Sequence, residues 1–234
     1  MNQPAHPPGY AVPPPPAPVL PVFGSELLFP VHRVYCVGRN YAAHAVEMGG
    51  DPDREPPFFF QKNPDNLNPS GLFPYPPASS DVHFEVELVV ALGQGGADIP
   101  LDDALDHVYG YAVGIDMTRR DLQAKAKELS RPWEVAKAFE GSAPCGHIMP
   151  ADQVGYPAAG GISLDVNGKR RQTGDLNQMI WKVPEIVSHL SGLFTLAPGD
   201  VIFTGTPAGV GAIVRGDVMT AHIEGVGGIE VRVT

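Results

Sequence analysis

Cysteine is scarce in this chain of 234 residues. It has two, Cys36 and Cys145, and no Cys-x-x-Cys pair. Two cysteines cannot build the disulfide framework of a small secreted domain, and the ligand spacing of a structural zinc site is missing. We therefore expect a cytoplasmic protein, since the cytoplasm is reducing.

Positive charge and long apolar runs are also in short supply. Lysine and arginine total 16 against 26 acidic residues, so the formal net charge is -10 and the pI is near 5.1. Such a balance opposes binding to a phosphate backbone. No run reaches the roughly 18 apolar residues of a membrane span, and the start of the chain lacks the basic and apolar regions of a signal peptide. We expect neither a nucleic-acid partner nor a membrane partner.

Glycine and proline, in contrast, are abundant. The 27 glycines and 26 prolines make up about 23% of the chain, against a combined average of about 12%. Nine prolines fall within residues 1–22, and such a stretch is extended and poor in backbone donors. We predict a proline-rich tail over residues 1–24, either a solvated arm or a ligand for a PxxP-binding domain. A single domain then follows over residues 25–234.

The hydrophobic pattern of that domain predicts a strand-rich α+β fold with short helices. Strands are expected at 33–37, 82–92, 109–115, 162–166, 169–172, 201–204, 218–223 and 229–233. Helices are expected at 40–48, 118–129 and 184–193. Thr118 and Asp121 resemble a capping box at the start of the second helix. Asn167-Gly168 is a dipeptide that favours a type I′ hairpin turn.

Two glutamates stand on one face of the strand predicted at 82–92. Alternate residues of a strand share a face, so Glu85 and Glu87 lie side by side, roughly 6.5 to 7 Å apart along the strand. An exposed polar face with two unrelated glutamates would show the same spacing. However, the apolar residues at 89–92 indicate a strand buried on both faces, where a pair of carboxylates requires a cation.

Asp116 is a third acidic candidate. It lies where an apolar strand ends and the predicted helix begins, so it either joins the two glutamates or supports the helix start. Three carboxylates without cysteine ligands would form an all-oxygen site. Such a site suits a hard cation such as Mg²⁺ or Mn²⁺ and suits zinc poorly.

A candidate proton acceptor lies further upstream. If residues 40–48 are helical, His44 and Glu47 lie on one helix face and form a hydrogen-bonded pair. A carboxylate partner fixes the tautomer of an imidazole and stabilises its protonated form, as general-base catalysis requires. An ordinary surface pair on a helix is the alternative.

Two further segments could bind an anion. Lys137 sits within an apolar run at 136–139 of strand type, where a lysine either reaches solvent or pairs with a buried anion. The segment at 204–211, Thr-Gly-Thr-Pro-Ala-Gly-Val-Gly, follows a strand and suggests an anion-binding loop. It lacks the lysine of a P-loop, and a tight turn explains its glycines almost as well.

Five stretches in this order resemble the fumarylacetoacetate hydrolase family, in particular its small members that act on acylpyruvates. They are Val-Gly-Arg-Asn-Tyr at 37–41 with His44 and Glu47, His-Phe-Glu-Val-Glu-Leu at 83–88, Gly-Ile-Asp-Met-Thr-Arg-Arg-Asp-Leu-Gln at 114–123, Pro-Trp-Glu-Val-Ala-Lys-Ala-Phe at 132–139 and Thr-Gly-Thr-Pro at 204–207. The resemblance implies a mixed β-sandwich-like roll with short helices, and a homodimer.

The resemblance also implies roles for individual residues. Glu85, Glu87 and Asp116 match the ligands of a divalent cation, with Mg²⁺ expected first and Mn²⁺ or Ca²⁺ as alternatives. His44 and Glu47 match a pair that activates water, and Lys137 matches a lysine that stabilises an oxyanion. Positions that contact substrate are matched by Arg39, Tyr41, Lys62, Arg120, Gln123, Gly205 and Thr206. One departure is the loop Lys62-Asn63-Pro64, where the family has proline directly after lysine.

The implied reaction is hydrolysis of a carbon-carbon bond in a 2,4-dioxo acid. Fumarylpyruvate, cleaved to fumarate and pyruvate in the gentisate route of aromatic catabolism, is the expected substrate. Oxaloacetate decarboxylation and keto-enol isomerisation on the same metal site are the alternatives. A binding module without catalysis would have no need for His44, Glu47 and Lys137 beside three metal ligands.

Overall fold

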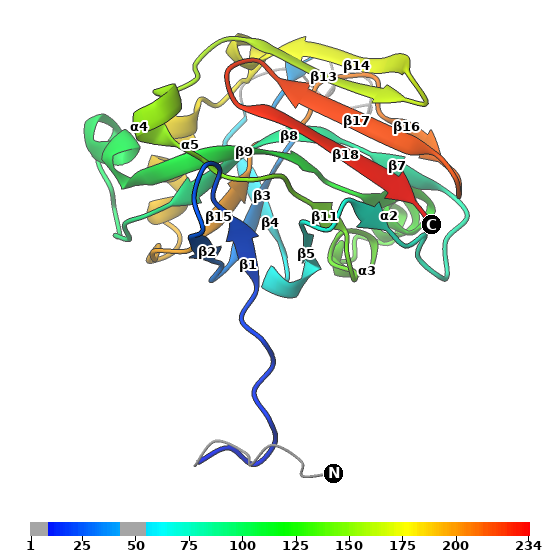
Figure 1. Ribbon diagram of the computed structural model, residues 1–234, viewed down its shortest axis with the longest axis horizontal. Coiled ribbons are helices and arrows are strands. Elements are labelled where there is room, and N and C mark those ends of the chain that lie inside the picture. Colours follow the sequence, from blue (N-terminus) through cyan, green and yellow to red (C-terminus); the bar gives the residue numbers. More distant parts are fainter. Residues whose placement is uncertain (1–8, 43–54) are drawn as a thin grey trace.

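The structure is a computed structural model that describes residues 9–42 and 55–234 (Figure 1). Residues 9–17 are exposed and extend away from the body of the molecule. The folded part begins at β1 (Val19–Pro21), which pairs antiparallel with β2 (Leu28–Pro30). The tail boundary predicted at residue 24 is therefore too late, because Leu20 and Val22 already belong to a buried apolar cluster.

A mixed six-stranded sheet with the order β12-β9-β8-β15-β3-β4 lies at the centre. The strand β15 runs parallel to β3, and every other neighbouring pair is antiparallel. The strands are β3 (Val34–Gly38), β4 (Phe58–Lys62), β8 (Val86–Leu92), β9 (Val108–Ile115), β12 (Met149–Pro150) and β15 (Val201–Phe203).

A five-stranded sheet, at the top of Figure 1, packs on one face of the central sheet. Its order is β14-β13-β17-β18-β6. The strands are β6 (Leu72–Phe73), β13 (Gly161–Val166), β14 (Lys169–Asp175), β17 (Val218–Ile223) and β18 (Gly227–Val233). The predicted hairpin is confirmed as β13–β14, and Asn167 and Gly168 adopt the positive φ angles of 52° and 73° that its turn needs.

Two smaller sheets complete the strand-rich α+β fold. One has the order β10-β7-β16 and contains β7 (Val82–Phe84), β10 (Thr118–Arg119) and β16 (Gly211–Ile213). The other pairs β5 (Leu67–Asn68) with β11 (Ala143–Pro144) in parallel. The predicted strand at 82–92 is thus divided at Glu85 between two sheets.

The helices are short. The α-helices are α2 (Arg120–Glu128), α3 (Glu134–Lys137), α4 (Ala151–Val154) and α5 (Val183–Ser191), and the 3₁₀ helices are η1 (Pro64–Asn66), η2 (Leu101–His107) and η3 (Leu176–Gln178). Across the described residues, no helix has the length and apolar character needed to cross a membrane. Most of the helix predicted at 40–48 falls outside the described residues.

The capping box predicted for α2 is wrong. Thr118 lies in β10, and Arg119 holds the N-cap position without a side-chain cap bond. Asp121 accepts hydrogen bonds from the Ser79 hydroxyl (2.7 Å) and from the backbone N–H of Leu122 (2.8 Å). Burial alone would raise the pKa of Asp121, but these bonds outweigh it and lower the pKa below the usual range.

The run at 136–139 is not a strand either. Lys137 ends the one-turn helix α3, and its backbone N–H donates to the carbonyl of Trp133 (2.9 Å). Four residues are too few to distinguish the two-residue period of a strand from the 3.6-residue period of a helix, so the hydrophobic pattern of this segment is uninformative.

The strand β8 is buried along its whole length. Leu88 and Val90 join the apolar cluster between the two large sheets, whereas Val89 and Ala91 join the cluster on the opposite face of the central sheet. This confirms the prediction of a strand covered on both faces, which is typical of a central strand.

The directions of the strands bring the ends of several of them to one edge of the central sheet. The start of β8 pairs with the end of β9, through Val86 and Ile115. The end of β15 pairs with both β8 and β3 at Phe203. The polar segments that precede β8 or follow β9, β15 and β3 therefore meet at the same place, although they are far apart in the sequence.

Candidate metal centre and substrate cavity

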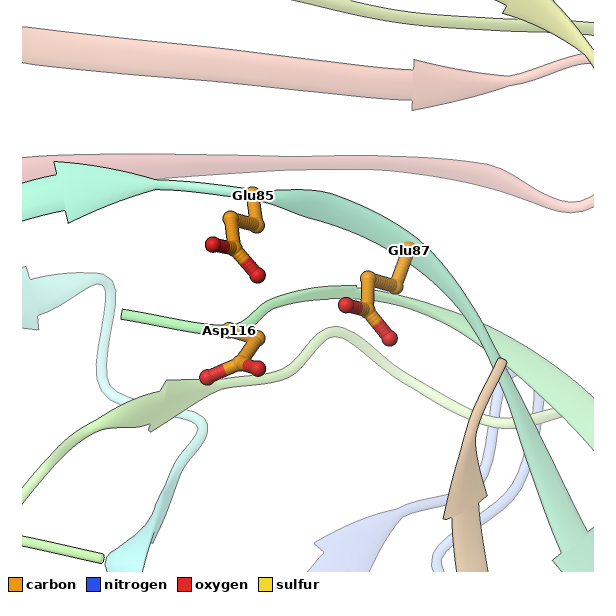
Figure 2. A group of neighbouring side chains, drawn as sticks. All are labelled: Glu85, Glu87 and Asp116. Carbon is orange, nitrogen blue, oxygen red and sulfur yellow. The ribbon is translucent and has the colours of Figure 1, made fainter. Parts of the chain in front are cut away.

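Three carboxylates meet at this edge of the sheet, as Figure 2 shows. Glu85 lies between β7 and β8, Glu87 lies in β8, and Asp116 directly follows β9. Each offers an oxygen, and these three oxygens lie within 4.8 Å of one another. All three residues are buried, with exposed fractions of 5%, 2% and 1%. The predicted convergence of Glu85, Glu87 and Asp116 is thus present in the structure.

Basic side chains hold two of these carboxylates. The Lys137 ammonium lies 2.9 Å from Glu85 Oε2 and 2.6 Å from Asp116 Oδ2. Burial lowers the pKa of Lys137, but attraction to Asp116 and Glu85 outweighs it and the net shift is upward. Arg120 forms an ion pair with Glu85 Oε1 and donates a second hydrogen bond to Gln123 Oε1 at 2.7 Å. A buried carboxylate needs such compensation.

Glu87 is the least compensated of the three. Within the described residues it accepts the backbone N–H of Gly205 at 2.7 Å and has no ion pair. Burial raises its pKa well above the ordinary glutamate value, and the negative charges of Asp116 and Glu85 raise it further. The donor set is all oxygen, buried and short of positive charge at Glu87, so it fits a hard divalent cation.

A cavity opens beside the carboxylates. Besides the three acids, it is lined by residues from the ends of β3 and β15, from β4, and from α2 and α3: Val37, Gly38, Arg39, Phe58, Phe60, Arg120, Gln123, Lys127, Trp133, Lys137, Gly205 and Thr206. The structure therefore brings Arg39, Arg120, Gln123, Gly205 and Thr206, all predicted from the sequence, to one cavity with Lys137.

Aromatic rings form one wall of this cavity. The Trp133 ring meets those of Phe58 and Phe60 at centroid separations of 5.6 and 5.8 Å. The Lys127 ammonium lies over the Trp133 ring at 5.3 Å. Burial lowers the pKa of Lys127, and the positive charges of Arg120 and Arg39 lower it further. The cavity thus combines an aromatic wall with several positive charges, which favours an anionic ligand.

Lys62 does not reach the cavity as predicted. It is 2% exposed, and its ammonium lies 2.8 Å from Asp116 Oδ1 and 3.0 Å from the hydroxyl of Ser142. It also donates to the carbonyls of Met117 (3.3 Å) and Lys137. The last residue of β4 thus supports a metal-ligand candidate, and its ammonium is fully occupied by protein groups.

Tyr41 is also absent from the cavity lining. It is buried, its backbone bridges to Met179, and within the described residues its hydroxyl has no hydrogen-bond partner. Burial raises the pKa of that hydroxyl. His44 and Glu47, the predicted catalytic pair, lie outside the described residues.

The sequence reasoning missed two buried amides that fix the loop after β15. Asn40 donates to the carbonyls of Trp181 (2.9 Å) and Thr204 (2.8 Å) and accepts the N–H of Trp181 (2.7 Å). A Cβ on Gly205 would lie 2.7 Å from the Asn40 Cβ, so this close approach requires glycine. Gln172 contacts the same loop from β14. A lone asparagine or glutamine has no spacing pattern, and only the position of Asn40 inside a family-like stretch could have indicated it.

Comparison with known proteins agrees with the site. Residues 33–234 match the family described as fumarylacetoacetate (FAA) hydrolase C-terminal. A crystal structure of fumarylpyruvate hydrolase from Pseudomonas aeruginosa, in complex with Mn²⁺ and pyruvate, superposes with a TM-score of 0.94 at 54% identity and covers 96% of this chain and 99% of that one.

Relatives with different names are almost equally similar in sequence. A fumarylpyruvate hydrolase from a Ralstonia species is 44% identical over 80% of this chain and 98% of its own length. A mitochondrial oxaloacetate tautomerase from Arabidopsis thaliana is 41% identical over 85% of this chain and 89% of its own. The match spans nearly the whole folded part, and the chain belongs to the fumarylacetoacetate hydrolase family.

Proposed function

We propose that this protein is a metal-dependent hydrolase that cleaves an acylpyruvate, with fumarylpyruvate as its substrate and fumarate and pyruvate as its products. The observation that carries the proposal is one cavity that combines Glu85, Glu87 and Asp116 with Lys137 and Arg120. The named activities of the relatives from Pseudomonas aeruginosa and Ralstonia support the choice of substrate.

Glu85, Glu87 and Asp116 would hold the cation, which we propose to be Mg²⁺. Its three buried oxygen ligands suit a hard ion, and the relative's Mn²⁺ is an ion of the same class. A divalent cation in this position supplies Lewis-acid polarisation and a fixed template for neighbouring substrate oxygens.

The remaining residues bind and orient the anionic substrate. The positive charges of Arg39 and Lys127 lie beside the aromatic wall and would attract a carboxylate, while Arg120, Gln123 and Thr206 would hold the pyruvate part. Lys137 is buried and donates toward the acids, so its charge would stabilise negative charge that develops on the substrate.

The hydrolytic step needs a water molecule and a base, and we propose His44, oriented by Glu47, for that role. The base removes a proton from the water as the water oxygen bonds to the 4-carbonyl carbon. The bond between carbons 3 and 4 then breaks, and its electron pair stays on the pyruvate part, which takes up a proton. General-base catalysis typically contributes about 10²- to 10⁴-fold, so loss of His44 would slow the reaction without abolishing it.

Action on oxaloacetate, by tautomerisation or decarboxylation, is the alternative. The Arabidopsis thaliana relative at 41% identity favours it, and neither reaction adds water to a carbonyl. His44→Ala separates the two functions, because it should slow acylpyruvate hydrolysis by about 10²- to 10⁴-fold and spare reactions of oxaloacetate.

A panel of 2,4-dioxo acids and oxaloacetate, assayed with Mg²⁺ or Mn²⁺ and with EDTA, tests the proposal. We expect metal-dependent release of pyruvate from fumarylpyruvate. Asp116→Asn should abolish binding of Mn²⁺ in calorimetry, whereas Asp102→Asn, at an exposed carboxylate of η2, should leave it unchanged. If the wild type cleaves none of the dioxo acids in the presence of metal, the hydrolase assignment fails.

We also propose that the folded part acts as a single catalytic domain, as a cytoplasmic homodimer, with the proline-rich tail dispensable for catalysis. Residues 9–17 make no strand and are exposed, which supports the last point. Light scattering and an assay of the chain without residues 1–17 test it. A mass of one protomer, or loss of activity on truncation, would contradict the respective proposal.

A further inference from the structure

Gln172 connects the metal-ligand strand with the loop that follows β15. It lies in β14, in the five-stranded sheet, and is fully buried. Its Oε1 accepts the backbone N–H of Val86 at 3.0 Å, and its Nε2 donates to Thr206 Oγ1 and to the carbonyl of Pro207, both at 2.8 Å. One amide thus contacts the residue between Glu85 and Glu87 and the wall of the cavity.

The orientation of this amide is fixed by backbone groups whose polarity is known. An N–H can only donate, so the group facing Val86 must be the oxygen of Gln172. A carbonyl can only accept, so the group facing Pro207 must be the nitrogen. The reversed amide would place two donors together at Val86 and two acceptors together at Pro207.

This orientation determines the role of the Thr206 hydroxyl. The second N–H of Gln172 points at Thr206 Oγ1, and an amide nitrogen accepts no hydrogen bond, so the hydroxyl oxygen must be the acceptor. The hydroxyl hydrogen then has to point elsewhere. Within the described residues it has no acceptor, and Thr206 lines the cavity.

We propose that Gln172 is a positioning residue that forces the Thr206 hydroxyl to act as a hydrogen-bond donor toward the substrate carboxylate. The inference rests on the proposed function, since it needs an anionic ligand in this cavity. A hydroxyl that is already oriented as a donor binds a carboxylate more tightly. A freely rotating hydroxyl would first have to be fixed in the donor orientation, and this would cost part of the binding free energy.

Close packing keeps β14 and the loop together. A Cβ on Gly209 would lie 2.3 Å from the carbonyl oxygen of Arg171, and a Cβ on Gly174 would lie 2.7 Å from the Pro207 Cβ. Gly209 also has φ of +98°. The loop thus lies directly on the strand at both sides of Gln172, which leaves the amide little freedom to move away from Thr206.

The test measures binding of pyruvate to the full-length protein saturated with Mn²⁺, by calorimetry. Gln172→Met removes the amide at similar volume, and Gln172→Glu keeps an acceptor for Val86 but replaces the donor facing Thr206. We expect each to weaken pyruvate binding by about 10- to 100-fold, as loss of one hydrogen bond to a charged group does. Affinity for Mn²⁺ should change by less than about threefold. The control is Thr173→Val, the next and exposed residue of the strand.

A double-mutant cycle shows whether Gln172 acts on pyruvate binding through the Thr206 hydroxyl or only by supporting the loop. Thr206→Val should weaken pyruvate binding as much as Gln172→Met does, and Thr206→Ser should retain it. In the Thr206→Val background, Gln172→Met should have less than about a threefold further effect. In turnover of a 2,4-dioxo acid the loss should fall on KM, with kcat nearly unchanged, because a bond to the carboxylate is made throughout the reaction.

Other results would overturn the inference. Full and additive losses in the double mutant would make Gln172 a structural support only, and wild-type affinity in Thr206→Val would show that the hydroxyl donates nothing, whether or not the Gln172 variants fold. Failure of the wild type to bind pyruvate with Mn²⁺ would count against the proposed function itself, whereas normal wild-type binding with unaffected variants would count against this inference alone.

Discussion

Lys62 offers the sharpest test of how this site is balanced electrostatically. Its buried ammonium lies 2.8 Å from Asp116 Oδ1 and also bonds the Ser142 hydroxyl and two backbone carbonyls. We expect Lys62→Met to destabilise the metal-free protein strongly, because it leaves a buried carboxylate with one fewer counter-charge and three buried acceptors with one fewer donor.

The size of the loss follows from the contacts. Removal of one partner from a buried ion pair costs about 3–5 kcal/mol, and Asp116 keeps its second partner, Lys137, at 2.6 Å, so the lower limit of about 3 kcal/mol applies. At about 2–4 °C per kcal/mol for a protein of this size, the melting temperature in EDTA should fall by about 6–12 °C. Differential scanning fluorimetry measures this directly, with exposed Lys169→Met as the control.

Metal should then restore part of the loss. A cation bound by Glu85, Glu87 and Asp116 replaces the missing positive charge, so saturating Mn²⁺ should raise the melting temperature of Lys62→Met by more than that of the wild type. The uncharged acceptors still have one fewer donor, so recovery should be incomplete. A drop of less than about 2 °C in EDTA, or an equal shift by Mn²⁺ in both proteins, would refute the assignment of Lys62 as a counter-charge of the metal site.

Three further predictions concern the rest of the fold. Gly205→Ala should lower the free energy of unfolding in urea by about 1–3 kcal/mol more than Gly155→Ala, because both have positive φ but only the first meets a neighbouring Cβ at 2.7 Å; equal losses would argue against the close approach. Asp121→Asn should cost about 1 kcal/mol at neutral pH, because it weakens the hydrogen bonds that the carboxylate accepts. The folded-state pKa of Asp121 is lowered, so this contribution should be present above the usual aspartate pKa and disappear as pH falls through the folded-state pKa. A difference that is constant with pH would contradict this. Cys36 and Cys145 are fully buried, and burial raises the pKa of the Cys145 thiol to about 12, so a thiol reagent should label neither in the native protein and both after unfolding; rapid native labelling would contradict their burial.

The acidic centre was predictable because its residues obey strand periodicity. Glu85 and Glu87 alternate with buried apolar residues, and Asp116 follows the last apolar residue of β9. Pairing of β8 with β9 through Val86 and Ile115 then brings the three together. Periodicity could not show that the predicted strand is interrupted at Glu85. The backbone N–H of Val86 there donates to the side chain of Gln172, which belongs to the five-stranded sheet.

The tail boundary and the state of residues 136–139 failed for a related reason. Proline content correctly indicates an extended segment, but Leu20 pairs with Phe29 and belongs to an apolar cluster whose other members lie as far along the chain as Phe203. Lys137 belongs to a single helical turn whose position is set by its ion pairs with Glu85 and Asp116. In both cases tertiary contacts decide the local structure, and short segments contain too few residues for their own pattern to compete.

Three residues whose roles the sequence did not reveal share one property: each holds another residue of the site in place. Lys62 binds Asp116, Asn40 fixes the backbone beside Gly205, and Gln172 binds Thr206. Each supplies a partner to a buried polar group, and loss of such a partner costs about 1–3 kcal/mol per unsatisfied group. Since the three acids are buried together in one place, residues that supply counter-charges and hydrogen-bond partners around them are a physical requirement of the site.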